Sequence, residues 1–305
     1  MEIKTVSIVG LGALGVLFGQ RLSENMPKEN LRIIADSERI AKYCRENIFC
    51  NGVPCSFNYV TPEEPASPSD LIIFAVKYND LPAAIRAAEN HVGKETTILS
   101  LLNGISSEEL IGKAFGSEKV LYSVAQGMDA VKVGNSLNYK NMGMICFGTD
   151  REGKNKARAD AVKSFFVKTN VPHELVFDMY TRLWGKFMLN VGVNQTVAVF
   201  EGDYGDIQKL GAARDTMIAA MREVIILSKA ENVNLSQTDL DYWLGILDGL
   251  NPRGKPSMRQ DLEAKRFSEV ELFSGTVLAL GEKHGLNFPV NQMLYDKIKA
   301  IESSF

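Results

Sequence analysis

Short apolar runs alternate with helix-like segments through the first half of the chain. The runs are apolar or rich in β-branched residues and end in polar residues or Gly/Asn turns; they are Thr5–Val9, Leu31–Ala35, Leu71–Val76, Thr97–Leu102 and Val120–Ala125. This alternation predicts a parallel sheet covered by helices. Thr61–Asp70 contains three prolines and predicts an irregular surface connection.

Three further segments extend this first region. Leu137–Tyr139 and Met144–Phe147 are separated by a turn containing Gly143, and they predict an antiparallel hairpin added at the sheet edge. Lys154–Lys168 is amphipathic and predicts a helix. Val171–Phe177 predicts a last short extended piece.

Beyond about Asp178 the strand pattern gives way to helical periodicity. Four segments carry it: Tyr180–Phe200, Ala212–Glu231, Ser236–Leu247 and Ser257–His284, the last as one long helix that Gly285 would end. We therefore expect an α/β domain over residues 1–177 followed by an all-α domain over residues 178–305.

Composition narrows the class of partner. The chain has 305 residues and a net charge of −3, from 34 Lys+Arg against 37 Asp+Glu, so nucleic acid is not expected as a partner. The four cysteines and three histidines show no C-x-x-C or His i, i+4 spacing, so no metal site is expected. A small-molecule ligand becomes the leading class.

The N-terminal apolar run Val6–Phe18 resembles a signal peptide only superficially. Glycines interrupt it, Glu2 lies where basic residues would be expected, and no small-residue cleavage site follows. No stretch reaches the roughly 18 apolar residues of a membrane span. We expect a cytoplasmic protein without a membrane partner, and the free-cysteine pattern fits a reducing compartment.

A glycine loop follows the first predicted strand and precedes a helix. It is Gly10-Leu11-Gly12-Ala13-Leu14-Gly15. In this context the first glycine makes a tight turn, the second lets the backbone approach a pyrophosphate, and the third lets helix pack on strand. The loop predicts a Rossmann-type, doubly wound sheet that binds a dinucleotide, with a ligand-free glycine turn as the alternative.

Asp36 ends the second predicted strand, where an acid can accept both ribose hydroxyls of an adenosine and repel a 2′-phosphate. This position favours NADH. Ser37 and Arg39 could instead contact a phosphate if Asp36 turned away, and Asp36 could serve only as a helix N-cap.

Three polar residues form a stripe on an otherwise apolar helix. Lys186, Asn190 and Asn194 stand at i, i+4 and i+8 within Leu183–Phe200. A solvated face is the simpler interpretation, but asparagines are poor helix formers. In a cleft, their amides would bind a carboxylate or hydroxyl, and the lysine would supply a charge and a proton.

Other candidates lie near helix starts and strand ends. Ser257 opens the last long segment, and with Gln260 it could form a capping box rather than contact a ligand. Glu269 lies between Phe267 and Val270, so it is either exposed or paired, with Lys186 as a natural partner.

Lys77 and Asn103 each follow a predicted strand, where open α/β sheets bind ligands. A lysine that reaches solvent along an apolar surface and an Asn-Gly turn are the structural alternatives.

Five dispersed motifs give this chain a resemblance to the ketopantoate reductase (2-dehydropantoate 2-reductase) family. They are Gly10–Gly15, Ala75-Val76-Lys77, Leu102-Asn103-Gly104, the Lys186/Asn190/Asn194 helix, and Ser257-Met-x-Gln-Asp261 followed by Ser268-Glu269. The resemblance implies a Rossmann domain, a helical domain and an active site between them, which reduces ketopantoate to pantoate with NADPH in pantothenate biosynthesis.

The resemblance also implies roles for individual residues. Lys186 resembles the proton donor and, with Glu269, is a catalytic candidate. Asn190, Asn194 and Ser257 resemble substrate-binding residues. The positions that resemble cofactor contacts are Lys77, Asn103, Ala130 and Glu269.

The chain departs from the family pattern both where the cofactor and where the substrate are expected to bind. Asp36 replaces the usual arginine, Tyr204 and Gly254 stand where relatives can place substrate-binding asparagines, and Gln195 replaces a proline. The departures leave open an NAD-dependent D-2-hydroxyacid dehydrogenase for another 2-oxo acid, and a non-catalytic dinucleotide sensor. Apolar helices after residue 205 could supply the surface of a homodimer.

Overall fold

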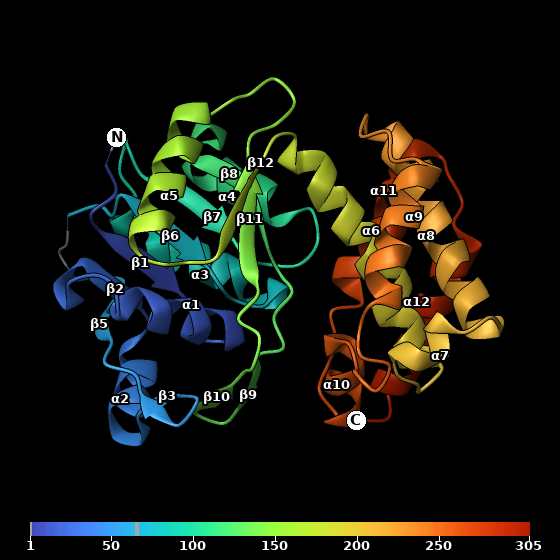
Figure 1. Cartoon of the computed structure of the whole chain (residues 1–305), viewed down its shortest axis with the longest axis horizontal. Helices are drawn as coiled ribbons and strands as arrows, with labels where there is room; N and C mark the ends of the chain where they lie inside the picture. Colours follow the sequence, from blue (N-terminus) through green and yellow to red (C-terminus); the bar gives the residue numbers. More distant parts are fainter. Residues whose placement is uncertain (1, 65–66) are drawn as a thin grey trace. The chain divides into compact units, whose positions relative to one another are not determined.

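The computed structural model describes residues 2–64 and 67–305, and the chain divides into two compact units, Met1–Tyr180 and Thr181–Phe305. The sequence had suggested a boundary after residue 177. The first unit is an α/β sandwich and the second is helical (Figure 1). Pro65 and Ala66 of the predicted Thr61–Asp70 connection lie outside the described residues.

Eight strands form the main sheet of the first unit, in the order β12-β11-β8-β7-β6-β1-β2-β5. Their bounds are β1 Val6–Val9, β2 Leu31–Ile34, β5 Asn58–Val60, β6 Leu71–Phe74, β7 Thr97–Ser100, β8 Val120–Gln126, β11 Met144–Gly148 and β12 His173–Val176. The strands from β5 to β8 are mutually parallel, as the apolar runs predicted.

The strand order reverses at β1. From β1 the chain goes outward to β2 and β5, and then returns to β6 on the other side of β1. In open α/β sheets this reversal leaves a crevice at the carboxyl ends of the two central strands, where ligands bind. The sheet therefore places the glycine loop after β1 beside the residues that follow β6.

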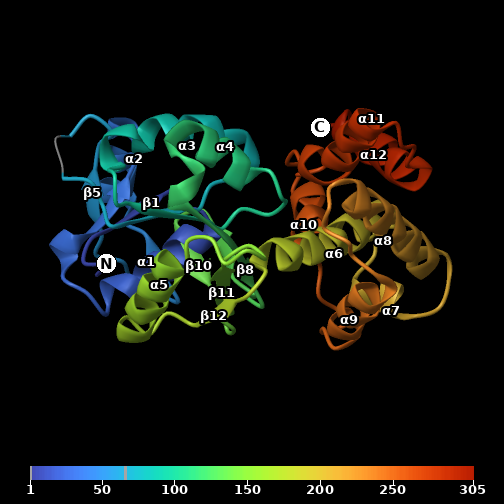
Figure 2. The same ribbon diagram turned by 90° about the horizontal axis from the view of Figure 1, so that it is seen from above.

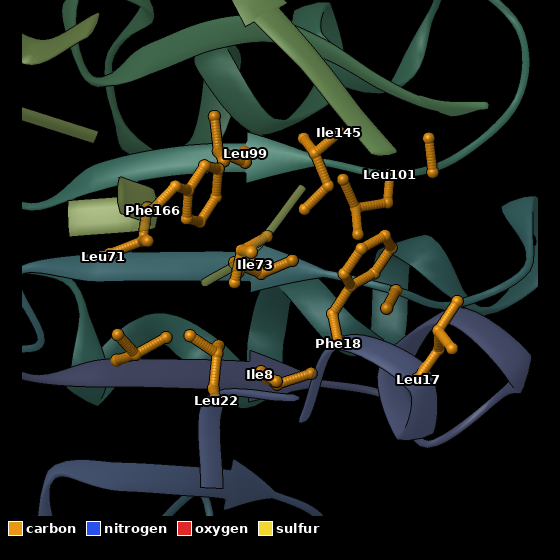
Figure 3. Packing of buried hydrophobic residues seen from close by; sticks show 14 of the residues in the cluster. Ile8, Leu17, Phe18, Leu22, Leu71, Ile73, Leu99, Leu101, Ile145 and Phe166 are labelled. Atoms are coloured by element: carbon orange, nitrogen blue, oxygen red, sulfur yellow. The ribbon is translucent and has the colours of Figure 1, made fainter. Parts of the chain in front are cut away.

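Helices cover both faces of this sheet (Figure 2). The helices of the first unit are α1 Ala13–Ser23, α2 Ser37–Glu46, α3 Leu81–Ala88, α4 Ser107–Phe115 and α5 Lys156–Lys168. Residues of α1 and α5 share one buried cluster with Ile8 and Ile73, which Figure 3 shows, and residues of α3 and α4 share another with Ile72 and Ile98.

The predicted hairpin of Leu137–Tyr139 with Met144–Phe147 is wrong. β10 (Ser136–Asn138) instead pairs antiparallel with β9 (Val131–Val133) and parallel with β3 (Phe49–Cys50), in a small second sheet completed by β4 (Val53–Pro54). β11 pairs antiparallel with β8. Gly134 adopts a positive φ and makes the tight turn between β9 and β10. β10 therefore pairs with β9, which lies nearer to it in the sequence than β11 does.

The second unit is helical, as predicted. Its helices are α6 Met179–Val199, which starts at the end of the first unit, α7 Tyr204–Gln208, α8 Ala212–Ala230, α9 Gln237–Asp248, α10 Ser257–Glu263, α11 Thr276–His284 and α12 Pro289–Glu302. α6 is apolar on most faces, with Trp184 and Phe187 almost fully buried.

The prediction of one long helix over Ser257–His284 is wrong. The chain breaks after α10, where Lys265 adopts a left-handed conformation and the Arg266 amide donates back to the Asp261 carbonyl at 2.9 Å. A short π-helix, Glu271–Gly275, then precedes α11. No glycine or proline marks the break, so periodicity alone could not locate it.

A tertiary contact fixes the broken segment. The carboxylate of Glu302, at the end of α12, is 4% exposed and accepts from the Ser268 amide at 2.7 Å and the Ser268 hydroxyl at 2.6 Å. A continuous helix would bond the Ser268 amide to its own backbone and leave this buried carboxylate without those donors. The contact with α12 therefore stabilises the break.

We expect Glu302→Ala to lower the free energy of unfolding by about 2–4 kcal/mol, because two buried donors on Ser268 lose a charged acceptor. Urea denaturation followed by circular dichroism measures the change. The matched control is Glu282→Ala, which removes an exposed carboxylate of the same unit and should shift stability by less than about 0.5 kcal/mol. Equal stabilities for the two variants would refute the assignment.

Candidate functional site

The glycine loop shows why glycines occupy its first and third positions. Gly10 has a φ of +98°, and a Cβ there would lie 2.6 Å from the Val76 side chain. A Cβ on Gly15 would overlap the Gly10 carbonyl oxygen. Gly12 is different, because its Cβ would approach only the Ala75 carbonyl, at 3.6 Å. The fold requires Gly10 and Gly15, whereas Gly12 leaves its backbone open to a ligand.

The start of α1 offers donors to an anion. Gly12 is the N-cap and supplies no side-chain hydrogen bond, and the first turn contains no acidic residue. The first amide groups of a helix have no acceptor within the helix, and the helix dipole favours negative charge there. With the open Gly12 position, these features fit the pyrophosphate of a dinucleotide.

A pocket of about 310 Å³ adjoins the glycine loop. The glycine loop supplies Gly10 and Leu11. Asp36, between β2 and α2, and Arg39 and Tyr43 of α2 form a second side. Residues of α3 close another side, among them Arg86. The pocket is bounded by the end of β1, the end of β2 and a helix beyond β6, where the strand order predicts a ligand.

Asp36 is the N-cap of α2, which is the structural role that the sequence offered beside ribose binding. Its Oδ1 accepts from the Arg39 amide at 2.7 Å, and its Oδ2 lies 3.4 Å from the Arg39 Nε. The carboxylate also lines the pocket. A carboxylate has about four acceptor positions, so capping leaves capacity for ribose hydroxyls.

The remaining predicted cofactor residues of the first unit occupy turns. Lys77 is exposed after β6, and Asn103 is half-buried after β7, just before Gly104 with its positive φ. Both therefore follow parallel strands at the same edge of the sheet as the glycine loop. Ala130 precedes β9 and packs against the core.

The polar stripe of α6 is not a solvated face. Asn194 is 6% exposed, and Lys186 and Asn190 are half-buried. The Asn194 side-chain amide donates to the Asn190 Oδ1 at 3.3 Å. Lys186 lies one helical turn before Asn190, so the stripe presents a cation and two amides on one face.

The second unit brings Ser257 to this stripe. The Ser257 hydroxyl donates to the Asn194 Oδ1 at 3.3 Å, and the Met258 amide lies 3.5 Å from the same oxygen. The capping box, the structural alternative for Ser257, is not formed, because Pro256 is the N-cap of α10 and the Gln260 side chain donates to the Lys255 carbonyl. Proline offers no side-chain acceptor, and Asn194 takes that role.

Glu269 lies in the break between α10 and the π-helix and is half-buried. Its carbonyl accepts from the amides of Leu272 and Phe273 at the start of the π-helix. π-Helical turns are frequent at functional sites, because they displace side chains from regular helix positions. The backbone of Glu269 is thus held at an irregular turn of the second unit.

Two departures from the family pattern contact each other. The Tyr204 amide donates to the Gly254 carbonyl at 3.0 Å, and a Cβ at position 254 would lie 2.8 Å from the Tyr204 ring. Burial raises the pKa of the Tyr204 hydroxyl. The Tyr204 ring therefore occupies the space that a side chain at position 254 would need, and Gly254 lies three residues before Ser257 in the chain.

Gln195, a third departure, belongs to a buried network. Its side chain donates to the Val191 carbonyl at 2.8 Å and accepts from the Ser274 amide at 3.2 Å within the π-helix. Asn291, at the start of α12, extends the network to Glu223 of α8. Gln195 therefore links the helix of the polar stripe to the segment that follows Glu269.

Two further features bear on the predicted class. No three His, Cys, Asp or Glu side chains within residues 2–64 and 67–305 are placed to hold a metal ion. No helix in the described part of the chain is long and apolar enough to cross a membrane.

Two family models match most of the chain. Residues 6–151 match "Ketopantoate reductase PanE/ApbA", and residues 178–302 match "Ketopantoate reductase PanE/ApbA C terminal". The chain belongs to the ketopantoate reductase family. It is accordingly a 2-dehydropantoate 2-reductase-like oxidoreductase, and the resemblance and fold class inferred from the motifs are confirmed.

Relatives of the family are distant in sequence. A 2-dehydropantoate 2-reductase of Streptococcus pyogenes is 24% identical, with 98% of each chain covered. Among solved structures, D-mandelate dehydrogenase with NADH and anilino(oxo)acetate has a TM-score of 0.85 at 21% identity, covering 98% of this chain and 99% of that one. A dimeric ketopantoate reductase from Staphylococcus aureus has a TM-score of 0.77 at 18% identity, with 98% and 99% covered.

Sequence reasoning missed some pocket residues of this family member. Tyr43 and Arg86 line the pocket beside the glycine loop, but neither belongs to a motif. Tyr43 lies four residues after Arg39, so helical spacing from Asp36 would have placed it on the same face of α2. Arg86 had no comparable signal, because its position depends on how α3 packs.

The glycine loop predicts opposite effects for two equivalent changes. Gly12→Ala should fold with nearly unchanged thermal stability, because its Cβ has room, but should weaken dinucleotide binding by about tenfold or more. Gly15→Ala should lower thermal stability, because its Cβ would overlap backbone. Thermal melts and titration with NADH or NADPH measure both. Unchanged binding by Gly12→Ala would contradict the assignment of this loop.

Proposed function

We propose that this protein reduces the 2-oxo group of ketopantoate to pantoate with NADH or NADPH, within pantothenate biosynthesis. The first unit binds the dinucleotide and the second binds the 2-oxo acid. The open Gly12 position, the pocket beside Asp36 and the NADH named in the D-mandelate dehydrogenase structure of the same fold support the dinucleotide assignment.

The observation that carries the substrate assignment is the polar chain beside Lys186, in which buried Asn194 joins half-buried Asn190 to exposed Ser257. Asn190, Asn194 and Ser257 bond to one another within an apolar helical unit. Amides and a hydroxyl offer donors and acceptors to the carboxylate and hydroxyl groups of an acid. Burial of Asn194 at 6% exposure limits competition from water.

The mechanism follows from the chemistry of these groups. The bound dinucleotide supplies the hydride, which is transferred to the carbonyl carbon of the acid. Lys186 donates a hydrogen bond to the carbonyl oxygen, stabilises the negative charge that develops there, and then protonates it. Lys186 regains its proton from solvent. Asn190, Asn194 and Ser257 orient the acid for this transfer.

We expect Lys186→Ala to lower kcat by about 10²–10⁴, because loss of a positioned acid has effects of this size. The dinucleotide dissociation constant should stay within about twofold, because the proposed dinucleotide site lies in the other unit. Steady-state kinetics and cofactor titration measure the two quantities. Lys297→Ala removes an exposed lysine of the same unit and serves as the control. Near-normal turnover of Lys186→Ala would refute the proposal.

Asp36 favours NADH over NADPH. Its carboxylate lines the pocket and would oppose a 2′-phosphate through like charge, while its free acceptor positions suit ribose hydroxyls. Arg39 reduces this preference, because its Nε lies 3.4 Å from the same carboxylate. The family resemblance implies NADPH, and Asp36 is the feature of this chain that argues for NADH.

We expect Asp36→Asn to shift the ratio of NADPH to NADH affinity by about tenfold toward NADPH. Asparagine is also a good N-cap, so α2 should keep its start and the change should isolate the charge. Dissociation constants for both cofactors measure the ratio. Asp80→Asn, a second acidic residue of the same pocket, is the control. An unchanged ratio in Asp36→Asn would remove the argument for NADH.

A second function is an NAD-dependent D-2-hydroxyacid dehydrogenase for another 2-oxo acid. The specific observation in its favour is the Tyr204 ring against Gly254, which places an aromatic group where the family resemblance implies polar asparagines. Comparing kcat/KM for ketopantoate with that for branched and aromatic 2-oxo acids separates the two functions.

A non-catalytic sensor remains the third hypothesis, and the presence of Lys186 and Glu269 argues against it. Homodimerisation also stays a prediction. Exposed apolar side chains on the second unit, including Leu210, Ile226 and Ile246, support it.

A further inference from the structure

One carboxyl group of the first unit is buried away from any cation. Glu108 is the second residue of α4 and is 5% exposed. Its Oε2 accepts from the Ser107 hydroxyl at 2.8 Å, whereas its Oε1 has no hydrogen-bond partner within the described residues. Glu109 next to it is exposed and pairs with Lys113. Burying a carboxyl oxygen without a hydrogen-bond partner costs free energy, so its presence here calls for an explanation.

Glu108 ends a chain of buried serines. The Ser107 hydroxyl lies 2.8 Å from that of Ser100, the last residue of β7. Ser100 in turn donates its amide to the Ser123 hydroxyl on β8, and Ser123 donates back to the Ser100 carbonyl. The network joins β7, β8 and α4, and it spans both sides of the turn at 101–106.

That turn carries Asn103, a proposed cofactor contact. Its backbone depends on Gly104, with a φ of +87°, and on the Leu102 amide, which lies 3.4 Å from the Ser100 hydroxyl. The Ser106 hydroxyl is buried and also has no partner within the described residues. The serine chain is therefore a buried polar support of this turn.

Burial raises the pKa of Glu108 to about 7, and the Ser107 hydroxyl and the amides of Glu108 and Ser123 oppose that rise. The nearest titratable group on β8 is Tyr122, whose own pKa burial raises to about 12, with Tyr180, Glu108, Asp150 and Glu109 adding to the rise. These neighbours are acidic, so they would not stabilise a carboxylate.

The charged groups on the adjoining elements are exposed or paired with one another. Lys113 on α4 pairs with Glu109, and Lys119 beyond α4 pairs with Glu118. Arg86 on α3 lines the pocket beside the glycine loop. The causes of the shift at Glu108 are burial, one hydroxyl and two amides, without a cation.

We propose that Glu108 is a positioning residue: as the neutral acid it holds the 101–106 turn through Ser107 and Ser100, and its ionisation loosens that turn and weakens dinucleotide binding. The inference rests on the proposed function, because it takes Asn103 as a cofactor contact. The step is a proton exchange with solvent. Once ionised, the unpartnered Oε1 requires water or a donor, and the turn that the serine chain supports is displaced when that requirement is met.

The test is the dissociation constant of NADH, measured by fluorescence titration of the full chain without substrate from pH 5.5 to 8.5. Wild type should bind NADH about thirtyfold more weakly at pH 8.5 than at pH 6, since each pH unit above the pKa reduces the neutral fraction about tenfold. Glu108→Gln keeps the shape and lacks the charge, so its NADH affinity should not vary over this range. Glu109→Gln, the exposed neighbour, should keep the wild-type profile.

Ser107→Ala gives a second test if Glu108→Gln folds poorly. The Ser107 hydroxyl lowers the pKa of Glu108, so its removal should move the midpoint of the binding profile to higher pH. A wild-type profile that is flat, or that Glu108→Gln and Ser107→Ala both leave unchanged, overturns the inference. Failure of wild type to bind NADH or NADPH at any pH would instead refute the proposed function.

The pH dependence of thermal stability in the cofactor-free protein distinguishes a positioning role of Glu108 from a purely structural one. The folded pKa of about 7 lies above the ordinary value of 4.5, so Glu108 contributes stability that is fully present below pH 4.5 and is lost as the pH rises through 7. Thermal melts should show this loss in wild type and not in Glu108→Gln. A loss of stability without any change in NADH affinity would assign Glu108 a structural role and overturn the inference.

Discussion

The close contact between α1 and the turn after β1 is the constraint on which the dinucleotide site depends. Helix and strand approach so closely that a Cβ on Gly15 would overlap the Gly10 carbonyl, and a Cβ on Gly10 would press on Val76. This packing sets the start of α1 beside the carboxyl ends of β1 and β6, where the strand order reverses. The pocket beside Asp36 and the open backbone of Gly12 both follow from it.

In the second unit the constraint is different: polar groups buried among packed helices need hydrogen-bond partners. Asn194 is almost fully buried and bonds to Asn190 and Ser257, and the same requirement joins Gln195 to Ser274 in the π-helix. Glu302 holds Ser268 for the same reason. Satisfying these groups breaks the long helix expected over Ser257–His284, and it gives Glu269 and Ser257 their irregular surroundings.

The sequence predicted those features that local patterns control. Strand runs, the glycine loop and the spacing of Lys186, Asn190 and Asn194 each follow from a short period or motif, and the structure contains them. The break after α10 depends on Glu302, more than thirty residues further along the chain, so local periodicity could not reveal it. Glu108 lies in a Ser-Ser-Glu-Glu sequence typical of an exposed helix start, and only the packing of β8 and α4 buries it.

The proposed reaction transfers hydride from a nicotinamide dinucleotide to C2 of a 2-oxo acid. The most direct test incubates the protein with ketopantoate and NADH or NADPH that carries deuterium at both C4 positions of the dihydronicotinamide, and analyses the product by NMR. We expect pantoate with one deuterium at C2. Oxidation of the cofactor without deuterium in pantoate, or no turnover of ketopantoate and of branched and aromatic 2-oxo acids despite cofactor binding, would contradict it.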